Sequence, residues 1–293
     1  MRRRELLALA LLAAVPGAAS SASAERFRRG RLWRVEGRGA QSPSWIFGTI
    51  HVADERVLAL PPAVEQAFAA ARTYAFEAAP GREATGLLIE AGLAEPGQRV
   101  QDGLDAAEML VLASAAPQVP PALLGSLKPW AALINLTAPA GDTEETLDAR
   151  LLARAAARRM PGFGLELPEE QIEAFESIPL DVQWRLLRHA LAQRAQLQSL
   201  VEPSIRAWLA GDLAALHALQ SQAARGDAQL AADYAVLNRK LVVDRSAVMA
   251  HRLFLPLRRG GVFVAVGALH LYGGRSLLAE IESQGHRVQR VAV

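Results

Sequence analysis

The fold class is decided by residues 262–270, which read VFVAVGALH. A run of five apolar residues followed by Gly is typical of a strand that is buried on both faces of a parallel sheet. Residues 45–51 read WIFGTIH and repeat the same features in the same order: an apolar strand, a Gly, two small or apolar residues and a His. The two segments lie near opposite ends of the chain, so they predict a sheet assembled from distant parts.

The residues around these segments alternate between strand and helix patterns. Strands are predicted at 32–36, 44–50, 73–77, 163–167, 261–266 and 287–293, and helices at 61–72, 143–159, 168–175, 180–222, 227–257 and 273–284. The strand, helix, strand order between 44 and 77 predicts that the strand ending at Glu77 lies next to the first His-bearing strand. Residues 82–160 are predicted to form a helical insertion or lid, and residues 180–257 a helical hairpin.

The predicted fold is therefore α/β, with one domain over residues 25–293. Its core is a mixed β-sheet built from N-terminal and C-terminal strands and flanked by helices, with a large helical insertion.

Residues 1–24 have the composition of a secretory signal peptide. Three arginines precede an apolar run from Leu6 to Val15, and small residues ending Ala-Ser-Ala precede Glu25. The apolar run is about half of the roughly 20 residues that a membrane-spanning helix needs, so no transmembrane segment is expected in the mature chain. The sequence predicts export to the periplasm. The Arg3-Arg4 pair loosely matches a twin-arginine signal, so that route and the general secretory route both stay open.

Composition excludes several functional classes. The chain has no cysteine, which rules out disulfides, thiolate metal sites and thiol nucleophiles. The signal peptide contains three of the 32 basic and one of the 30 acidic residues, which leaves 29 of each. A neutral chain with few aromatic residues gives no electrostatic reason to expect nucleic acid or a membrane surface as a partner. The composition does not name a partner, and a peptide or small-molecule substrate of unknown identity is expected.

The two Gly-x-x-His segments place His51 and His270 at strand ends, where open α/β folds bind their ligands. An imidazole there can be a metal ligand or a general base. Glu77 ends its own strand and is the natural co-ligand or orienting partner of an imidazole. The structural alternatives are packing at strand ends for the two histidines and a capping or surface role for Glu77.

Glu166 and Arg245 have weaker claims from sequence alone. Glu166 follows a short strand, but its neighbourhood is generally acidic. Arg245 lies in a mostly apolar helix, where it can grip a carboxylate or an oxyanion, or pair with Asp244. The remaining histidines lack a partner pattern and are interpreted as surface or packing residues; they are His189, His217, His251 and His286. No serine has the context of a nucleophile elbow.

The chain resembles the TraB/GumN family in segments that follow one another from about residue 30 to the C-terminus. These segments are GTIH at 48–51, LPP at 60–62, FE at 76–77, GLE at 164–166, EQ at 170–171, DR at 244–245 and VGALHL at 266–271. The resemblance implies that His51, Glu77 and His270 form the core of the site, with Glu166 and Arg245 close by. The family usually has Asn after the Arg, whereas this chain has Ser246, which puts a ligand or orienting role at that position in question.

The family is similar to the TIKI metal-dependent peptidases and, more distantly, to erythromycin esterase-like hydrolases and a haem-binding lipoprotein group. The resemblance therefore implies an exported metal-dependent hydrolase of the peptidase type. His51, Glu77 and His270 would hold a divalent Mn²⁺, Co²⁺ or Zn²⁺ ion, while Arg245 would stabilise the oxyanion and Glu166 would assist catalysis.

Two alternatives stay open. One is a metal-independent hydrolase in which a histidine is the base and Glu77 orients it. The other is a non-catalytic protein that binds haem, a metal or an envelope partner in polysaccharide export.

Overall fold

A computed structural model describes residues 25–78, 82–137 and 146–293, so the predicted signal peptide and the predicted loop at 138–142 lie outside the described residues. Within the described residues, six strands form one mixed sheet. The strands are β1 (Leu32–Glu36), β2 (Ser44–Thr49), β3 (Thr73–Ala78), β4 (Gly162–Glu166), β5 (Val262–Gly267) and β6 (Arg287–Val291). The predicted assembly of the sheet from both ends of the chain is confirmed.

The strand order is β4-β3-β5-β2-β1-β6. Strands β4, β3, β5 and β2 are parallel, whereas β1 pairs antiparallel with both β2 and β6. The prediction that β3 lies next to β2 is wrong, because β5 lies between them. Every residue of β5 is buried, which suits a central strand covered on both faces.

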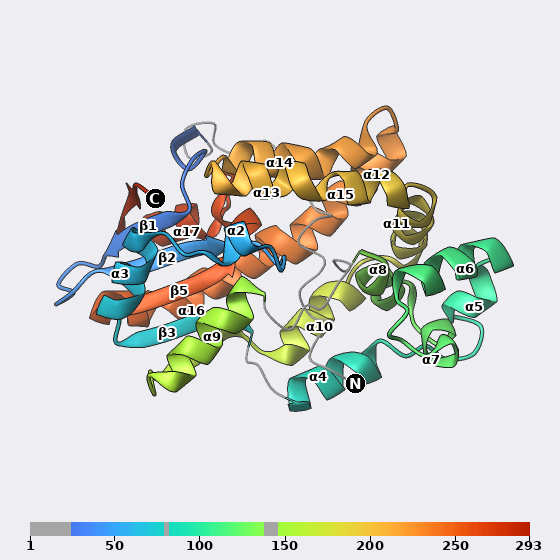
Figure 1. Ribbon diagram of the computed structural model, residues 1–293, viewed down its shortest axis with the longest axis horizontal. Helices are drawn as coiled ribbons and strands as arrows, with labels where there is room; N and C mark the ends of the chain where they lie inside the picture. The colour runs from blue at the N-terminus through green and yellow to red at the C-terminus, as the bar shows by residue number, and fades with distance from the viewer. Residues whose placement is uncertain (1–24, 79–81, 138–145) are drawn as a thin grey trace.

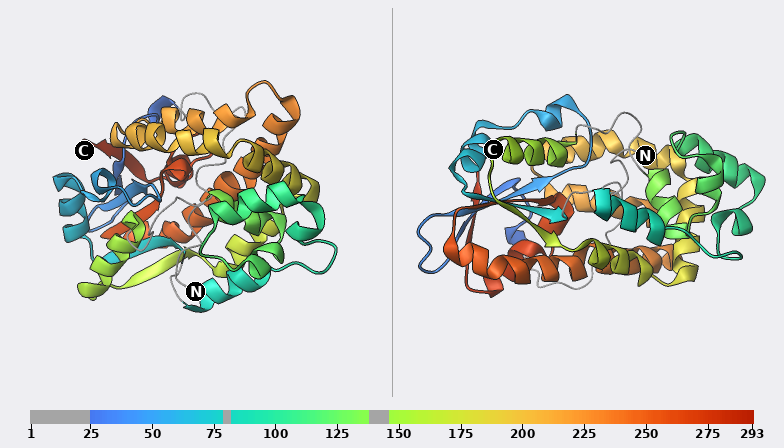
Figure 2. Two further views of the ribbon diagram at one scale, coloured as in Figure 1. Left: turned by 45° about the vertical axis from the view of Figure 1, so that its right-hand side comes forward. Right: turned by 90° about the horizontal axis from the view of Figure 1, so that it is seen from below.

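Helices cover both faces of the sheet in three layers (Figures 1 and 2). On one face lie α3 (Pro62–Ala70) and α9 (Leu147–Ala157); on the other lie α16 (Arg245–Arg259) and α17 (Leu277–Ser283). Aromatic rings of the first face pack edge to face on the central strand, as Phe68 does on Phe263 with ring centroids 5.2 Å apart.

A second, wholly helical part extends from one edge of the sheet (Figure 1). It includes α4 (Arg82–Ala91), α5 (Val100–Gly103), α6 (Ala106–Ala115), α7 (Pro121–Gly125), α8 (Pro129–Thr137), α10 (Pro168–Glu176) and α11 (Leu180–Ala192). Four further helices follow between α11 and the π-helical segment before α16; they are α12 (Arg194–Ser199), α13 (Val201–Leu209), α14 (Leu213–Ser221) and α15 (Ala228–Asn238). The single-domain boundary and the lid role of residues 82–160 stay predictions.

Several predicted helices differ from the observed ones. The helix predicted at 143–159 is observed as α9, and its predicted start at 143–145 lies outside the described residues. The predicted helix at 180–222 is divided into α11 to α14, with Gly211 at a positive φ of 63° between α13 and α14. The helix predicted at 273–284 begins later, at Leu277, because the Ser276 side chain caps it by accepting a hydrogen bond from the Ala279 N–H. The helix predicted over 227–257 contains a π-helical segment, η4 (Arg239–Asp244), directly before α16.

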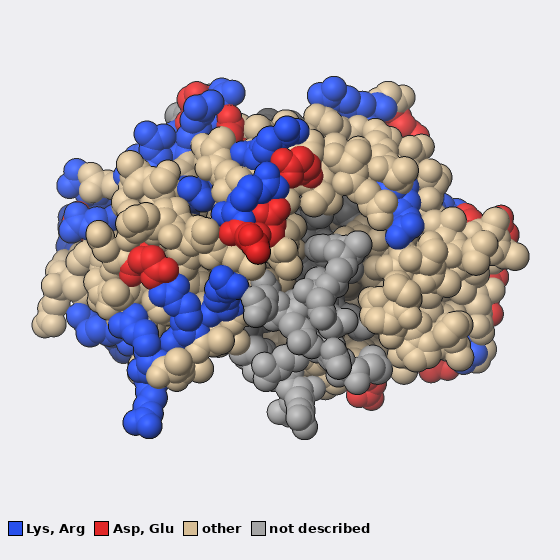
Figure 3. Space-filling view, in the orientation of Figure 1, with Lys and Arg blue, Asp and Glu red and all other residues tan. Residues whose placement is uncertain are grey.

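No helix within the described ranges is long and apolar enough to cross a membrane. On the face drawn in Figure 3, basic side chains gather over the half that contains the sheet, with acidic side chains among them. Surface arginines of the chain also form ion pairs, as Arg154 does with Glu65 and Arg56 does with Asp54 and Glu202. This face therefore has mixed charge.

Candidate functional site

The four parallel strands end at one edge of the sheet, and each brings a residue singled out from the sequence. His51 follows β2, Glu77 lies in β3 and Glu166 ends β4, while His270 lies in a 3-10 turn, η5 (Ala268–Leu271), directly after β5. In the β2–β5 register, Thr49 pairs with Gly267, so the two Gly-x-x-His segments leave the sheet side by side. The sheet thus gathers these residues at its carboxyl edge, where ligands bind in open α/β folds.

Arg245, the first residue of α16, joins two of the carboxylates at this edge. Its Nε and Nη2 atoms donate to the Glu166 carboxylate at 2.8 and 2.6 Å, and Nη2 also donates to Glu77 Oε1 at 2.5 Å. Its Nη1 donates to the Leu241 carbonyl at 3.2 Å, within the π-helical segment. All three guanidinium nitrogens are therefore engaged, and the guanidinium acts as a clamp on two glutamates. This is the grip on a carboxylate that the sequence left open, and the oxyanion role of Arg245 stays a prediction.

Glu77 is buried between this clamp and the backbone of β5. Its Oε2 accepts a hydrogen bond from the Gly267 N–H at 3.1 Å, and its side chain is 14% exposed. Burial alone would raise the pKa of Glu77, but Arg245, then His270 and His51, hold that pKa well below its ordinary value. Glu77 is thus an ionised carboxylate at neutral pH.

His270 is fixed through one nitrogen and presents the other to Glu77. Its Nδ1 lies 2.9 Å from Ser246 Oγ and 3.2 Å from the Val242 carbonyl oxygen, and its Nε2 lies 3.6 Å from Glu77 Oε1. The Ser246 hydroxyl donates to the Val242 carbonyl at 2.7 Å, so its oxygen can accept from Nδ1–H. The structure therefore places Ser246 beside His270 in an orienting position, which the sequence left in question.

His51 is fixed in the same way by a residue that the sequence did not single out. Its Nδ1 lies 2.8 Å from Oδ2 of Asp148, on the first turn of α9, and Oδ1 of the same carboxylate accepts from the Thr49 hydroxyl at 2.7 Å. Burial alone would lower the pKa of His51, but the charge of Asp148 and its hydrogen bond raise that pKa above its ordinary value. An acidic residue in a first helical turn is commonplace, so the sequence carried no signal for this contact.

Gly267 lies where these side chains converge. A Cβ atom added to it would lie 3.5 Å from Glu77 Oε2, 3.7 Å from His51 Nε2 and 3.7 Å from His270 Cδ2. Gly48 is different, because a Cβ atom there would lie too close to η5, at 2.8 Å from Leu271 Cδ1. Gly48 thus lets η5 pack closely against β2, whereas a Cβ at Gly267 would make ordinary contacts and would lie among the side chains of the site.

Two imidazoles and a carboxylate meet at this edge of the sheet, and these are donor groups that divalent metal ions bind. Both imidazoles have Nδ1 occupied by an acceptor and Nε2 directed toward Glu77 or Gly267, which is the arrangement that metal-ligating histidines show. Across residues 25–78, 82–137 and 146–293, no three His, Asp or Glu side chains already enclose a possible ion position. The residues fit a divalent metal by chemistry, and closing around one would require Glu77 to change its contacts.

The other four histidines lie elsewhere. Three pack against aromatic rings: His189 on Tyr234, His217 on Tyr272 and His286 on Phe254. His251 is exposed on α16. Burial lowers the pKa of His217 to about 4, so it is a neutral packing residue at physiological pH.

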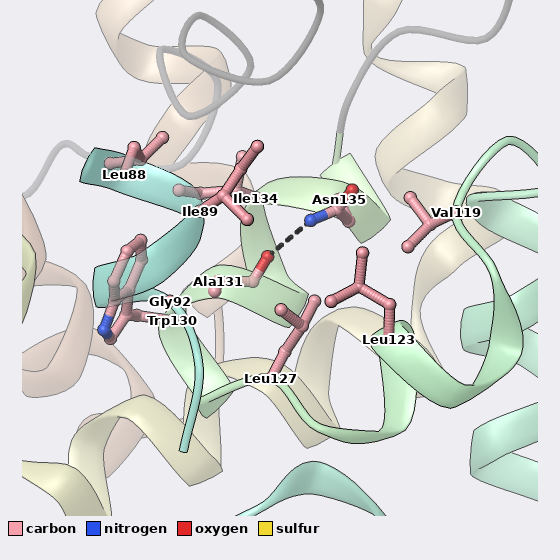
Figure 4. A pocket seen from close by; sticks show the side chains of 10 residues that line it. All are labelled: Leu88, Ile89, Gly92, Val119, Leu123, Leu127, Trp130, Ala131, Ile134 and Asn135. Carbon is pink, nitrogen blue, oxygen red and sulfur yellow. Dashed lines mark hydrogen bonds between the residues drawn. The ribbon is translucent and has the colours of Figure 1, made fainter. Parts of the chain in front are cut away.

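A pocket in the helical part is lined by residues of α4, α7, α8 and their neighbouring turns (Figure 4). Apolar side chains such as Leu88, Leu123 and Trp130 line most of it, and none of the five candidate residues takes part. The polar side chain in its wall, Asn135, donates from Nδ2 to the Ala131 carbonyl at 2.9 Å. This pocket is thus separate from the cluster of titratable residues.

Comparison with known proteins gives one match. The model of the TraB/PrgY/gumN family matches residues 31–290. No curated protein and no solved structure matches the chain. The family resemblance drawn from the sequence motifs is confirmed, and the further similarity to TIKI peptidases and esterase-like hydrolases stays a prediction.

Proposed function

The chain belongs to the TraB/PrgY/gumN family, and we propose that it is a metal-dependent hydrolase that acts on peptides. In this proposal His51 and His270, each through Nε2, and Glu77 through its carboxylate hold one divalent ion. When bound, such an ion polarises a carbonyl group and lowers the pKa of a coordinated water. Imidazole and carboxylate ligands suit Mn²⁺, Co²⁺ and Zn²⁺ alike.

The observation that carries this proposal is the matched state of the two imidazoles. In each ring an acceptor of the protein contacts Nδ1. The Nε2 of His270 faces Glu77, and the Nε2 of His51 lies beside Gly267. A histidine used only for packing has no need of this arrangement, whereas a ligating histidine needs the Nδ1 contact to fix its tautomer and ring plane.

The charge of the cluster also supports a bound divalent cation. It holds three carboxylates, those of Glu77, Glu166 and Asp148, and one guanidinium, that of Arg245. As metal ligands both imidazoles would be neutral, and these four groups would then carry a net charge of −2 in a largely buried place. Buried charge is costly unless it is paired or coordinates a metal, so a divalent cation matches what the cluster lacks.

We assign Glu166 and Arg245 to positioning within this function. Four of the five N–H donors of Arg245 and both oxygens of Glu166 are engaged in contacts within the protein. Together they hold Glu77 ionised and oriented.

The test measures bound metal in the mature protein, purified without chelators, by mass spectrometry and by titration with Mn²⁺, Co²⁺ and Zn²⁺. We expect about one ion per chain in the wild type, loss of that ion in His51→Ala and in His270→Ala, and metal-dependent cleavage of a peptide library. His251→Ala is the matched control, because this exposed histidine lies outside the cluster. A wild type that takes up none of the three ions overturns the proposal.

A second candidate is a metal-independent hydrolase in which His51 is the general base. The contact that favours it is the hydrogen bond between His51 Nδ1 and Asp148, because a carboxylate behind an imidazole strengthens it as a base. Cleavage that persists in excess chelator and is lost in His51→Ala would support this candidate. A haem absorbance band that disappears in the same variant would instead support the non-catalytic binding protein.

We also propose that the chain is exported and acts in the periplasm, on the strength of residues 1–24. The test is the mass of the protein recovered from the periplasmic fraction. A mature N-terminus at Glu25 is expected, and retention of Met1 contradicts export with cleavage. Replacing Arg3 and Arg4 by Lys separates the two routes, because only a twin-arginine signal needs the pair.

A further inference from the structure

We propose that Asp148 is a positioning residue that holds His51 in the tautomer with the proton on Nδ1. The helical insertion thereby supplies a working part of the site at the sheet edge. The effect on metal affinity rests on the proposed function, whereas the effect on the imidazole does not.

The geometry of the carboxylate carries the first step. Asp148 is held at both oxygens, Oδ1 by the Thr49 hydroxyl at 2.7 Å and Oδ2 by His51 Nδ1 at 2.8 Å. Two contacts on one carboxylate fix its plane, and an ionised carboxylate can only accept hydrogen bonds. The proton of a neutral His51 must then lie on Nδ1, which leaves the lone pair of Nε2 facing the space over Gly267.

The second step is the anchoring of α9, which carries Asp148. The helix begins after Thr146, whose side chain accepts from the Ala149 N–H at 3.3 Å, so Asp148 lies in the first turn of a capped helix. At the other end of α9, Arg158 donates to the carbonyls of Phe68 and Ala69, each at 2.9 Å. The helix is thus fixed to the end of α3.

A second set of contacts between α9 and α3 involves Arg154, nearer the middle of α9. Arg154 Nη1 donates to Glu65 Oε1 at 2.8 Å, and its guanidinium lies over the Phe68 ring at 5.1 Å from the centroid. These contacts place α9 on the face of the sheet from which Thr49 reaches Asp148. Asp148 therefore has a fixed position although it comes from the end of the insertion.

The third step is the difference between the two histidines. Behind His270, the acceptors are a serine hydroxyl and a backbone carbonyl, both neutral, whereas behind His51 the acceptor is a carboxylate. A carboxylate partner makes an imidazole a better electron donor and holds its tautomer more firmly. The two Gly-x-x-His segments are thus alike in sequence, but a charged acceptor holds His51 and neutral acceptors hold His270.

The first measurement is the nuclear magnetic resonance of ring nitrogens in metal-free protein labelled with ¹⁵N-histidine. The signals of His51 are assigned by their loss in His51→Ala. In the wild type we expect a protonated Nδ1 and an unprotonated Nε2, at a pH where the ring is neutral. A wild-type His51 protonated on Nε2 overturns the proposal without any variant at Asp148.

The variant Asp148→Asn removes the charge with little change in size. We expect a mixture of tautomers at His51 and an unchanged state at His270. The matched control is Asp181→Asn, because Asp181 is also the second residue of a helix that begins with Leu, yet it is exposed. That control should leave both imidazoles unchanged, and an Asp148→Asn protein with the wild-type tautomer overturns the proposal.

The second measurement is the affinity for Mn²⁺, Co²⁺ and Zn²⁺. Loss of a carboxylate that orients a ligating histidine typically weakens metal binding about 10- to 100-fold, and we expect a loss in that range for Asp148→Asn only. If the tautomer changes but the wild type binds no metal, the proposed function fails and the positioning role stands. If the wild type binds metal and Asp148→Asn binds it equally well, the positioning role toward the metal fails.

Discussion

Arg245 is a buried cation that pairs with two buried carboxylates of the site, Glu77 and Glu166. Its side chain is 14% exposed and its partners Glu77 and Glu166 are 14% and 1% exposed, so little water reaches any of the three. The charges of Glu166 and Glu77 raise the pKa of Arg245 despite its burial. The cation is therefore permanent, and removing it would leave two carboxylates buried together.

We predict that Arg245→Met destabilises the protein by about 3–5 kcal/mol, the usual result of leaving a buried charge without its partner. Urea unfolding followed by circular dichroism at pH 7 measures the change. Arg252→Met is the control, because the pair of Arg252 and Glu170 is more exposed, at 29% and 33%, and such pairs contribute about 1 kcal/mol or less. Equal losses in the two variants would contradict the buried clamp.

The pH dependence of stability follows from Glu77 and His51. Glu77 has a lowered pKa in the folded state, so its contribution is present above the unfolded value of about 4.3 and is lost as pH falls through the folded value. His51 has a raised pKa, so its contribution is fully present below about pH 6.5 and is lost as pH rises through its folded value.

The free energy of unfolding of the metal-free protein should therefore fall on both sides of a maximum between about pH 4.3 and pH 6.5. Denaturation curves at a series of pH values check this expectation. In Asp148→Asn the loss on the alkaline side should largely disappear, because the charge of Asp148 is the main favourable cause of the raised pKa. An alkaline loss of unchanged size in that variant would show that another group causes it.

The sequence identified the candidate residues at strand ends but not Asp148, which lies in the first turn of α9. His51, Glu77 and His270 follow apolar strands, and strand ends are where parallel sheets expose functional groups. Asp148 is an acidic residue in a first helical turn, like many others, and its contact with His51 spans 97 positions of the chain. Only the packing of α9 on the sheet distinguishes it.

The strands show where local patterns stop being sufficient. Each predicted strand exists, and β1 pairs antiparallel with β2, the next strand along the chain. The neighbours of β3 were not predictable in the same way. A strand, helix, strand pattern predicts a parallel pair, but it does not exclude a later strand from taking the place between them, as β5 does here.

Helix α8 carries a polar side chain in an otherwise apolar wall, and this leads to a stabilising prediction. Asn135 is 6% exposed, and its Oδ1 atom has no hydrogen-bond partner among the described residues. A buried acceptor without a partner costs about 1–3 kcal/mol. Asn135→Leu, of similar size, should therefore raise the free energy of unfolding by about 1 kcal/mol after the loss of the bond from Nδ2 to Ala131.

Thermal and urea denaturation of the Asn135 variants test this. Asn135→Asp is the opposing variant, because it places a charge at the same position, and it should be less stable than the wild type. An Asn135→Leu protein that is less stable than the wild type would show that Oδ1 has a partner in solution, such as a bound water.

At the scale of the whole molecule, the site is made by contacts between distant parts of the chain. Glu77 meets Arg245 across 168 positions and the Gly267 N–H across 190. The α/β class and the gathering of two strand ends were predictable, because the strand patterns at both ends of the chain are strong. The clamp and the anchoring of α9 were not, because they depend on how helices from the middle of the chain pack on the sheet.

A site assembled in this way exists only in the folded chain, so a metal held by it should stabilise the whole molecule. An ion that binds the folded state alone adds about 2.7 kcal/mol at a concentration 100 times its Kd. At about 2–4 °C per kcal/mol for a chain of this size, Mn²⁺, Co²⁺ or Zn²⁺ should raise Tm by about 5–10 °C. Differential scanning calorimetry measures the shift.

The variants decide where the ion binds. His51→Ala and His270→Ala should lose the increase in Tm, because each removes one imidazole ligand from a different end of the chain. His251→Ala should keep it. An increase that survives in both site variants would place the ion elsewhere, and no increase with any of the three ions would contradict a metal site formed by folding. The two histidines come together only when β2 pairs with β5 in the folded sheet. If both variants lose the metal-induced increase in Tm to the same extent, the metal site forms only in the folded chain.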